Sequence, residues 1–321
     1  MATMARPKTV VIVAFDGVQL LDATGPSAVF AKLEQLRTDS YRLIIASPRG
    51  GEVISSSGLV LARTLSLTDL PDEIDTLLIT GGDEADLRAA IFDDGLGEWV
   101  KIASPTIRRV GSICTGAFVL AAAGLLDGRR ATTHWHSCDL LQQMCPAANV
   151  EADVIYTVDP PIYTSAGVAA GIDLALALVE QDYGRAIAAA VARELVLFVR
   201  RPGSQSQFSA GLAAQANAPD RLKDLITWII EHPDADLSIA ALAARVGMSE
   251  RNFSRAFGKA TKRTPARFVE ETRFDHARDL LENSDWALER VAQRAGFGST
   301  DALNRAFRKR LGRTPANCRG G

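Results

Sequence analysis

The first two thirds of the chain alternate short β-branched apolar runs with stretches of helical period. The apolar run TVVIVAF is followed by the helical pattern TGPSAVFAKLEQL and then by a second apolar run, YRLIIAS. The same patterns predict further strands at 75–80 and 108–114 and helices at 115–124 and 170–184. Alternation of strands and helices is typical of a parallel sheet covered by helices on both faces. We therefore expect residues 1–200 to form an α/β domain.

The last third of the chain has a different pattern and a different charge. Residues 221–319 show helical periods throughout, punctuated by Gly and Thr-Pro, and residues 221–321 hold 19 basic and 13 acidic side chains, a net charge of +6. Residues 1–220 hold 17 basic and 25 acidic side chains, a net charge of -8. Residues 201–220 are rich in Ser, Gln, Ala and Gly and have no clear period, so we expect a linker there. The third part, 221–321, is then an all-α domain whose charge suits a polyanionic partner.

The basic domain contains an internal repeat with a period of about 50 residues. The segment VGMSERNFSRAFGKATKRTPARF (246–268) recurs as AGFGSTDALNRAFRKRLGRTPANC (295–318), and both copies keep a Gly, an Arg-Ala-Phe and a Thr-Pro. In each copy an apolar helix ends at the Gly, which suits a left-handed helix end, and a Ser or Ser-Thr then begins a second helix. Each copy therefore predicts a helix-turn-helix.

The second helix of each unit has an apolar face and a polar, cationic face. Phe253 and Phe257 in one copy, and Leu303 and Phe307 in the other, lie at i, i+4 spacing and hold the helix against its partner. Arg and Asn can pair with purine edges in the major groove, whereas Ser, Thr and Lys commonly bind phosphates. The alternative is a helical repeat whose outer faces are merely charged. The residues that we expect to face double-stranded DNA are Ser249, Arg251, Asn252, Arg255, Lys259, Ser299, Thr300, Asn304, Arg305 and Arg308.

Over residues 221–319 the chain resembles the AraC/XylS family of transcription regulators, whose DNA-binding part has two helix-turn-helix units. The most specific segment is VAQRAGFGSTDALNRAFRKRLGRTPANCR. Ala302 stands where the family usually has an aromatic residue, and Asn317 and Cys318 fall near its usual Tyr-Arg ending. The resemblance implies a central helix, about 265–281, that separates the recognition helices so that they enter successive major-groove segments, about 34 Å apart.

In the α/β domain the notable residue is Cys114, between the predicted strand RRVGSI and the predicted helix TGAFVLAAAG. The small residues Ser112 and Gly116 stand two places to either side, as a sharp strand-to-helix turn requires. Such a nucleophile elbow leaves the thiol at a helix N-terminus, where free backbone amides favour a thiolate. A buried structural cysteine at a strand-helix junction is the alternative interpretation.

Over about residues 8–200 the chain resembles the PfpI and class I glutamine amidotransferase-like superfamily, most strongly in SICTGAFVLAAAGLLDGRRATTHW. The resemblance is to the type that is fused to AraC modules. It implies a flavodoxin-like sandwich with a pocket around Cys114, built from an acid facing the thiol, a nearby histidine and backbone amide donors. By this resemblance Asp22 is the acid, His134 is the histidine, and the amide donors are those of Gly81, Gly82 and Thr115.

Three functions follow from this combination. The first is a transcription regulator controlled by a small-molecule effector bound near Cys114, with nitrogen-containing metabolites as one class of effector and with dimerisation through the α/β domain. The second is an enzyme of nitrile, isonitrile or amide chemistry with a DNA-binding tail, in which Cys114, Asp22 and His134 are the catalytic candidates. Peptidase-like relatives have His after the elbow Cys where this chain has Thr115, and the Cys-Thr pair is similar to that of isonitrile hydratase. The third is a redox sensor in which Cys114 forms a sulfenic acid.

The remaining composition narrows the class further. The four cysteines lack the spacing of zinc ligands or of a disulfide framework, so we expect no metal, no cofactor and a reducing compartment. No window approaches the roughly 18 apolar residues that span a bilayer, and the N-terminus shows no cleavage site of a signal peptide. We expect a cytoplasmic protein without membrane association that forms a homodimer.

Overall fold

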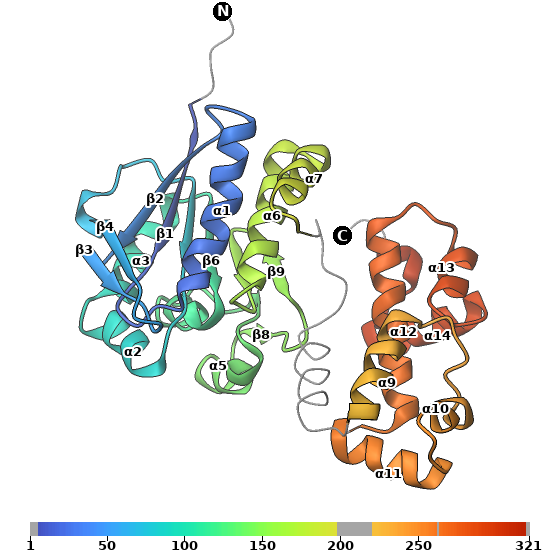
Figure 1. The fold of residues 1–321 in the computed structure, drawn as a ribbon. Helices are drawn as coiled ribbons and strands as arrows, with labels where there is room; N and C mark the ends of the chain where they lie inside the picture. Colours follow the sequence, from blue (N-terminus) through green and yellow to red (C-terminus); the bar gives the residue numbers. More distant parts are fainter. Residues whose placement is uncertain (1–5, 198–219, 262, 319–321) are drawn as a thin grey trace, which may run out of the picture. The chain divides into compact units, whose positions relative to one another are not determined.

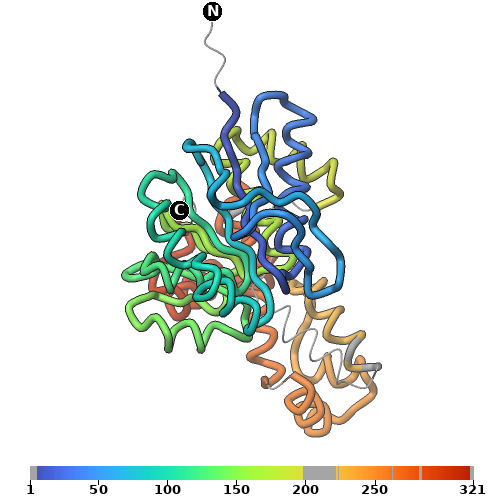
Figure 2. Tube along the Cα trace, turned by 90° about the vertical axis from the view of Figure 1, so that its left-hand side faces the viewer, coloured from blue at the N-terminus to red at the C-terminus, as the bar shows by residue number. Residues whose placement is uncertain are grey.

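The computed structural model describes residues 6–197, 220–261 and 263–318. The chain divides into two compact units, Met1–Arg201 and Pro202–Gly321, and Figure 1 shows strands only in the first, blue to yellow-green, among the described residues. The second unit, orange to red in Figures 1 and 2, consists of helices and short turns over its described residues. The predicted linker at 201–220 lies outside the described residues except for Asp220, with which a helix begins.

The first unit is built on an eight-stranded sheet with the order β3-β4-β2-β1-β5-β6-β10-β9. The strand pairs from β4 through β2, β1, β5 and β6 to β10 are parallel, and the edge pairs β3–β4 and β9–β10 are antiparallel. A separate two-stranded sheet joins β7 to β8. The strands are β1 (Lys8–Val13), β2 (Tyr41–Ser47), β3 (Arg49–Ile54), β4 (Val60–Ser66), β5 (Thr76–Ile79), β6 (Arg109–Ile113), β7 (Arg130–Ala131), β8 (Asn149–Val150), β9 (Tyr156–Asp159) and β10 (Ile162–Ser165).

Helices cover both faces of the sheet, as the alternating pattern predicts. Along β1, Val11 and Val13 belong to one core and Val10 and Ile12 to the other, because successive side chains of a strand point to opposite faces. The Val10 side is covered by α1 (Leu20–Leu36), α6 (Ala170–Tyr183) and α7 (Arg185–Glu194). The Val11 side is covered by α2 (Glu84–Phe92), α3 (Leu96–Ala103), α4 (Ala117–Ala122) and α5 (Cys138–Met144). Short 3-10 turns are η1 (Leu67–Asp69), η2 (Ser104–Thr106), η3 (Cys114–Gly116) and η4 (Trp135–Ser137).

The parallel order determines where a site can form. The chain passes from β1 to β2 on one side and places β5, β6 and β10 on the other, so the strand order reverses beside β1. In open α/β sheets, ligands bind at the carboxyl ends of the strands next to such a reversal. In this chain those ends lead into the loops that carry Gly81, Cys114 and Gly167.

The second unit contains the two predicted helix-turn-helix pairs. The first pair is α10 (Ile239–Arg245) and α11 (Glu250–Thr261), and the second is α13 (Leu288–Arg294) and α14 (Thr300–Leu311). The helix α9 (Asp220–Glu231) precedes them, and the 3-10 turn η5 (Pro315–Cys318) follows. The predicted central helix is α12 (Pro265–Asn283), which begins at the N-cap Thr264 and is two residues longer than expected at its C-terminal end.

Candidate functional site

Cys114 lies on the sharp turn that its small neighbours predict. Strand β6 ends one residue earlier than expected, at Ile113, because Cys114 has a φ of 56° and cannot continue an extended strand. A Cβ on Gly116 would lie 2.4 Å from the Ile79 carbonyl oxygen, so a glycine is required two residues after the thiol. The elbow geometry is therefore confirmed, with the turn η3 leading directly into α4.

Asp22 faces this elbow from the first turn of α1 and is completely buried. Its Oδ2 accepts a hydrogen bond from the Gly81 amide at 3.0 Å, and its Oδ1 accepts one from the Val168 amide at 2.7 Å. One carboxyl group thus connects α1 to the loops after β5 and β10. Burial raises the pKa of Asp22 to about 6, although both amide bonds favour the ionised form.

The thiol itself is not activated by this setting. Cys114 is 8% exposed, and burial, followed by the charge of Asp22, raises the pKa of its thiol to about 12, while hydrogen bonds from Thr115 lower it less. The expectation that helix amides favour a thiolate is wrong here, because the loss of water and a neighbouring carboxylate outweigh the effect of one helical turn. At neutral pH the site presents a neutral thiol.

The predicted amide donors are close to the elbow but already have partners. The Gly81 amide donates to Asp22, and the Gly82 amide donates to the Thr115 hydroxyl oxygen at 3.0 Å. The same hydroxyl donates to the Gly82 carbonyl oxygen at 2.9 Å. A Cβ on Gly81 would lie 2.8 Å from that of Cys114, so this loop packs directly against the thiol residue. The structure therefore brings Asp22, Gly81, Gly82, Cys114 and Thr115 together as one bonded cluster.

His134 is connected to this cluster through its neighbour. The hydroxyl of Thr133, which is buried, donates to the Cys114 carbonyl oxygen at 2.7 Å. The His134 ring is partly buried and lies 5.5 Å from the ring of Trp135, measured between centroids. Burial, and then the charge of His136, lower the pKa of His134, so the ring is neutral at neutral pH.

Two residues of the site were not predicted from the sequence, Gly167 and Val168. A Cβ on Gly167 would lie 2.1 Å from that of Cys114 and 2.7 Å from its sulfur, and Gly167 has a φ of 90°. Val168 has a φ of 51° and donates its amide to Asp22. A glycine two residues after the end of the buried strand β10 was the available signal, because such a glycine often permits close approach of another backbone.

The recognition helices of the second unit present the predicted faces. The four apolar residues Phe253, Phe257, Leu303 and Phe307 are completely buried. The Ser249 hydroxyl accepts from the Asn252 amide at 3.4 Å, and the Ser299 hydroxyl accepts from the Ala302 amide at 3.2 Å, which caps each helix. The side chains expected to face DNA are exposed except for Thr300 and Asn304, which are partly buried; the exposed ones are Ser249, Arg251, Asn252, Arg255, Lys259, Ser299, Arg305 and Arg308.

The cations described in this unit fall into two groups, those that pair with a carboxylate and those that do not. Lys309 pairs with Glu270 at 3.1 Å, and Arg310 and Arg267 both pair with Glu271. By contrast, within the described residues no carboxylate lies within 4.0 Å of the cations assigned to the DNA face, which are Arg251, Arg255, Lys259, Arg305 and Arg308. The recognition helices therefore carry unneutralised positive charge.

The departures from the AraC/XylS pattern are accommodated by local packing. Cys318 packs against the core of the second helix-turn-helix, and its thiol donates to the Thr314 carbonyl oxygen at 3.4 Å. Ala302 is partly buried at the cap of α14. Elsewhere in the described ranges, no three His, Cys, Asp or Glu side chains are grouped so as to hold a metal ion. Nor does any described helix combine the length and apolar character needed to cross a membrane.

The fold and these two sites define a two-part protein, an elbow-bearing α/β domain joined to a double helix-turn-helix domain. A model of the DJ-1/PfpI family matches residues 8–181, and a helix-turn-helix domain model matches residues 242–321. The HTH-type transcriptional regulator CdhR of Pseudomonas aeruginosa is 33% identical over 285 residues, which are 89% of this chain and 83% of CdhR. Isonitrile hydratase of Pseudomonas putida is 36% identical over 170 residues, 53% of this chain and 70% of that enzyme.

A solved structure gives the same result for the fold. The crystal structure of an AraC family transcriptional regulator from Pseudomonas putida matches with a TM-score of 0.53 and 26% identity, covering 59% of this chain and 100% of that one. The chain therefore belongs to the DJ-1/PfpI family. Its AraC-type helix-turn-helix domain places it among the HTH-type transcriptional regulators of that family.

Proposed function

We propose that this chain regulates transcription by binding a specific double-stranded DNA sequence, under the control of a small molecule bound beside Cys114. The observation that carries the proposal is the pair of capped recognition helices with exposed, unneutralised cations, both held by α12. Arg and Asn on such helices bind base edges in the major groove, and Lys binds phosphates.

The test of DNA binding uses the full chain and fragments of its source genome. Fragments retained at low salt are compared with scrambled sequences of the same composition in gel shifts at rising salt. A specific fragment should bind at least about 1,000-fold more tightly than its scrambled version, the lower range for specific regulators. Equal binding of both sequences at every salt concentration would refute sequence-specific regulation.

The effector site that we propose is the cluster of Asp22, Gly81, Gly82, Cys114 and Thr115, together with His134, which follows Thr133 in the chain. Its support is its position at the carboxyl ends of β5, β6 and β10, beside the reversal of strand order, where ligands of α/β sheets bind. The resemblance to regulators of this type favours nitrogen-containing metabolites such as amino acids or betaines. A thermal-shift screen of the full chain against amines, amino acids and nitriles tests this, with Asp22→Asn as the variant that should lose the response.

The raised pKa of the Cys114 thiol favours a site that binds an effector over a site that catalyses a reaction. Catalytic and redox-sensing cysteines have lowered pKa values, because the thiolate is the nucleophile. Burial and Asp22 have the opposite effect on Cys114. On this proposal Cys114→Ala leaves DNA binding intact; loss of a hydratase or amidase turnover would support the enzyme, and loss of a peroxide response alone would support the redox sensor.

The second copy of the chain in the proposed homodimer would bind at the edge hairpin β3–β4. Ile54, Leu59 and Val60 are 57%, 61% and 50% exposed there, and β3 is an edge strand. Exposed apolar edge strands are surfaces on which another chain can pair. Sedimentation of the full chain should show a dimer that Leu59→Lys converts to a monomer, and an unchanged mass would contradict this interface.

The proposed partner of the chain is chromosomal DNA. We therefore propose that the chain acts in the cytoplasm.

A further inference from the structure

The two helix-turn-helix pairs have separate hydrophobic cores. The first core includes Phe268 and Val269 from the beginning of α12. The second includes Phe274, Ala277 and Leu281 from its later turns. Among the described residues, α12 is the element that contributes to both cores. Apolar packing therefore holds each pair to its own part of α12, and polar contacts between these two parts restrain the angle between the pairs further.

Arg273 lies on α12 between these two sets of core residues. Its Nε donates to the Pro233 carbonyl oxygen at 2.9 Å, and its Nη2 donates to the Ala235 carbonyl oxygen at 3.1 Å. Both carbonyls belong to the loop between α9 and α10, which leads into the first pair. A planar guanidinium that binds two acceptors at once restrains orientation as well as distance. The loop is therefore held at one angle to α12.

The turn of the second pair presses against this contact. A Cβ on Gly296 would lie 2.0 Å from the Pro233 carbonyl oxygen and 2.6 Å from the Arg273 Nε. The repeat provides its own comparison: Gly247, which ends the first helix of the first pair, also has a positive φ, but a Cβ there would meet nothing within 4 Å. The backbone conformation requires glycine at both positions, whereas close approach to the loop before α10 and to Arg273 requires it only at Gly296.

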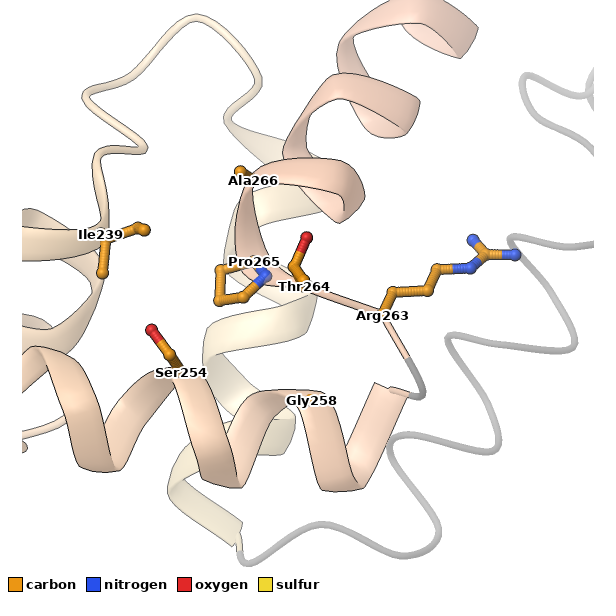
Figure 3. Close-up of a pocket in the computed structure, with 7 residues that line it drawn as sticks. All are labelled: Ile239, Ser254, Gly258, Arg263, Thr264, Pro265 and Ala266. Carbon is orange, nitrogen blue, oxygen red and sulfur yellow. The ribbon is translucent and has the colours of Figure 1, made fainter.

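The surroundings of this contact are not filled by apolar side chains. A groove of about 530 Å³ runs between the loop at Asp236 and the turn at Phe297, with Arg273 in its wall. Past Ile239 and Ala266 it adjoins the groove of about 580 Å³ shown in Figure 3, between α10, α11 and the beginning of α12. In this open space, the polar contact at Arg273 and the backbone approach at Gly296 restrain the angle, together with the ion pair between Arg294 of α13 and Asp234 of the same loop at 3.7 Å.

We propose that Arg273, bound to the Pro233 and Ala235 carbonyls with Gly296 against it, is the positioning residue that sets the spacing of the two DNA elements bound by the chain. This inference rests on the proposed DNA-binding function. Two recognition helices on one face of DNA need elements about 34 Å apart. A rigid connection makes the second contact intramolecular at high effective concentration, whereas a loose one lowers that concentration and admits other spacings.

Selection of DNA from a random library by the full chain tests the proposal. The wild type should recover two sequence elements at one spacing. Arg273→Met keeps the aliphatic stem and removes both hydrogen bonds, so it should recover the same elements at several spacings. It should also bind the complete site about tenfold more weakly and a single element equally well. Arg267→Met is the matched control, because Arg267 lies on the same helix with a 69% exposed side chain and should leave the spacing unchanged.

The outcomes separate the two proposals. A single spacing retained by Arg273→Met, or equal losses on the single element and the complete site, overturns the role of Arg273. If the circular dichroism of Arg273→Met shows an unfolded chain, Arg273→Lys replaces it. A single ammonium nitrogen in place of a planar fork should broaden the spacing, and a wild-type distribution overturns the proposal. Recovery of no sequence by the wild type refutes the proposed DNA-binding function itself.

Discussion

Replacing Asp22 with Asn tests whether the acid beside the elbow is as buried as the structure shows. The two side chains have nearly the same shape, but Asn cannot ionise. Both oxygens of Asp22 accept backbone amides, from Gly81 and Val168. In the variant an NH2 group meets one of these amides and leaves it unpaired, at a cost of about 1–3 kcal/mol that does not depend on pH.

The pH-dependent part follows from the pKa of Asp22, which burial raises to about 6 from 3.8. The folded chain therefore binds this proton more tightly than the unfolded chain. Below about pH 3.8 the group is protonated in both states and has no effect, and stability is lost as the pH rises from there through 6. At about 1.36 kcal/mol per pKa unit, the ionised group lowers the free energy of unfolding by about 3 kcal/mol above pH 6.

The assay compares urea unfolding of the wild type and Asp22→Asn between pH 4 and pH 7. Trp228 and Trp286, in the helical unit, are replaced by Phe in both proteins, so that fluorescence follows the α/β unit through Trp99 and Trp135. Other titrating groups are common to the two proteins and cancel in the difference. The stability of the variant relative to the wild type should rise by about 2–3 kcal/mol from pH 4 to pH 7. A difference that stays constant over this range would refute the burial argument.

Three further predictions concern DNA binding, backbone packing and the thiol. Arg305→Ala should reduce discrimination between specific and scrambled DNA by about 1–3 kcal/mol in gel shifts, whereas Lys259→Ala should weaken both equally and flatten the salt dependence by about one ion; the reverse pattern would contradict the face assignment. Gly167→Ala should lower the free energy of unfolding by several kcal/mol, because its Cβ would lie 2.1 Å from that of Cys114. The control Gly128→Ala has a similar φ but open space around the new Cβ, and it should lower the free energy of unfolding by only about 1–2 kcal/mol. Equal losses in the two variants would refute the close approach. Alkylation of Cys114 by iodoacetamide should be slow at neutral pH and still rising at pH 10, because burial raises the pKa of its thiol to about 12; a plateau below pH 9 would show an activated thiolate.

Local patterns were sufficient to predict much of this protein. The helix-turn-helix pairs were identified because apolar spacing, capping serines and turn glycines all act within a few residues, and the repeat shows each of them twice. The elbow at Cys114 was predicted for the same reason, since its requirement for small residues falls at Gly116, two positions away. The βαβ alternation likewise indicated the sheet and its two helical layers.

The state of the thiol could not be predicted in this way. The sequence places Cys114 at a helix N-terminus, which alone would favour a thiolate, but burial and Asp22, 92 positions earlier in the chain, reverse that effect. The approach of Gly167 to the thiol is equally a contact between distant segments. A pKa depends on every group that excludes water from the site, and those groups are assembled only by the fold.

The strands β3, β4, β9 and β10 were not predicted. The amino-acid sequence by itself determined the βαβ alternation, the turns of the two helix-turn-helix units, and which helix faces are cationic. These properties depend on residues within one or two turns of each other. Only the tertiary structure decided that the amides of Gly81 and Gly82 have partners, that the thiol is neutral, and that Arg273 connects a loop 38 to 40 positions earlier to the turn at Gly296. Each of these depends on the position of atoms from distant segments to within about an ångström, and no periodicity along the chain encodes such a distance.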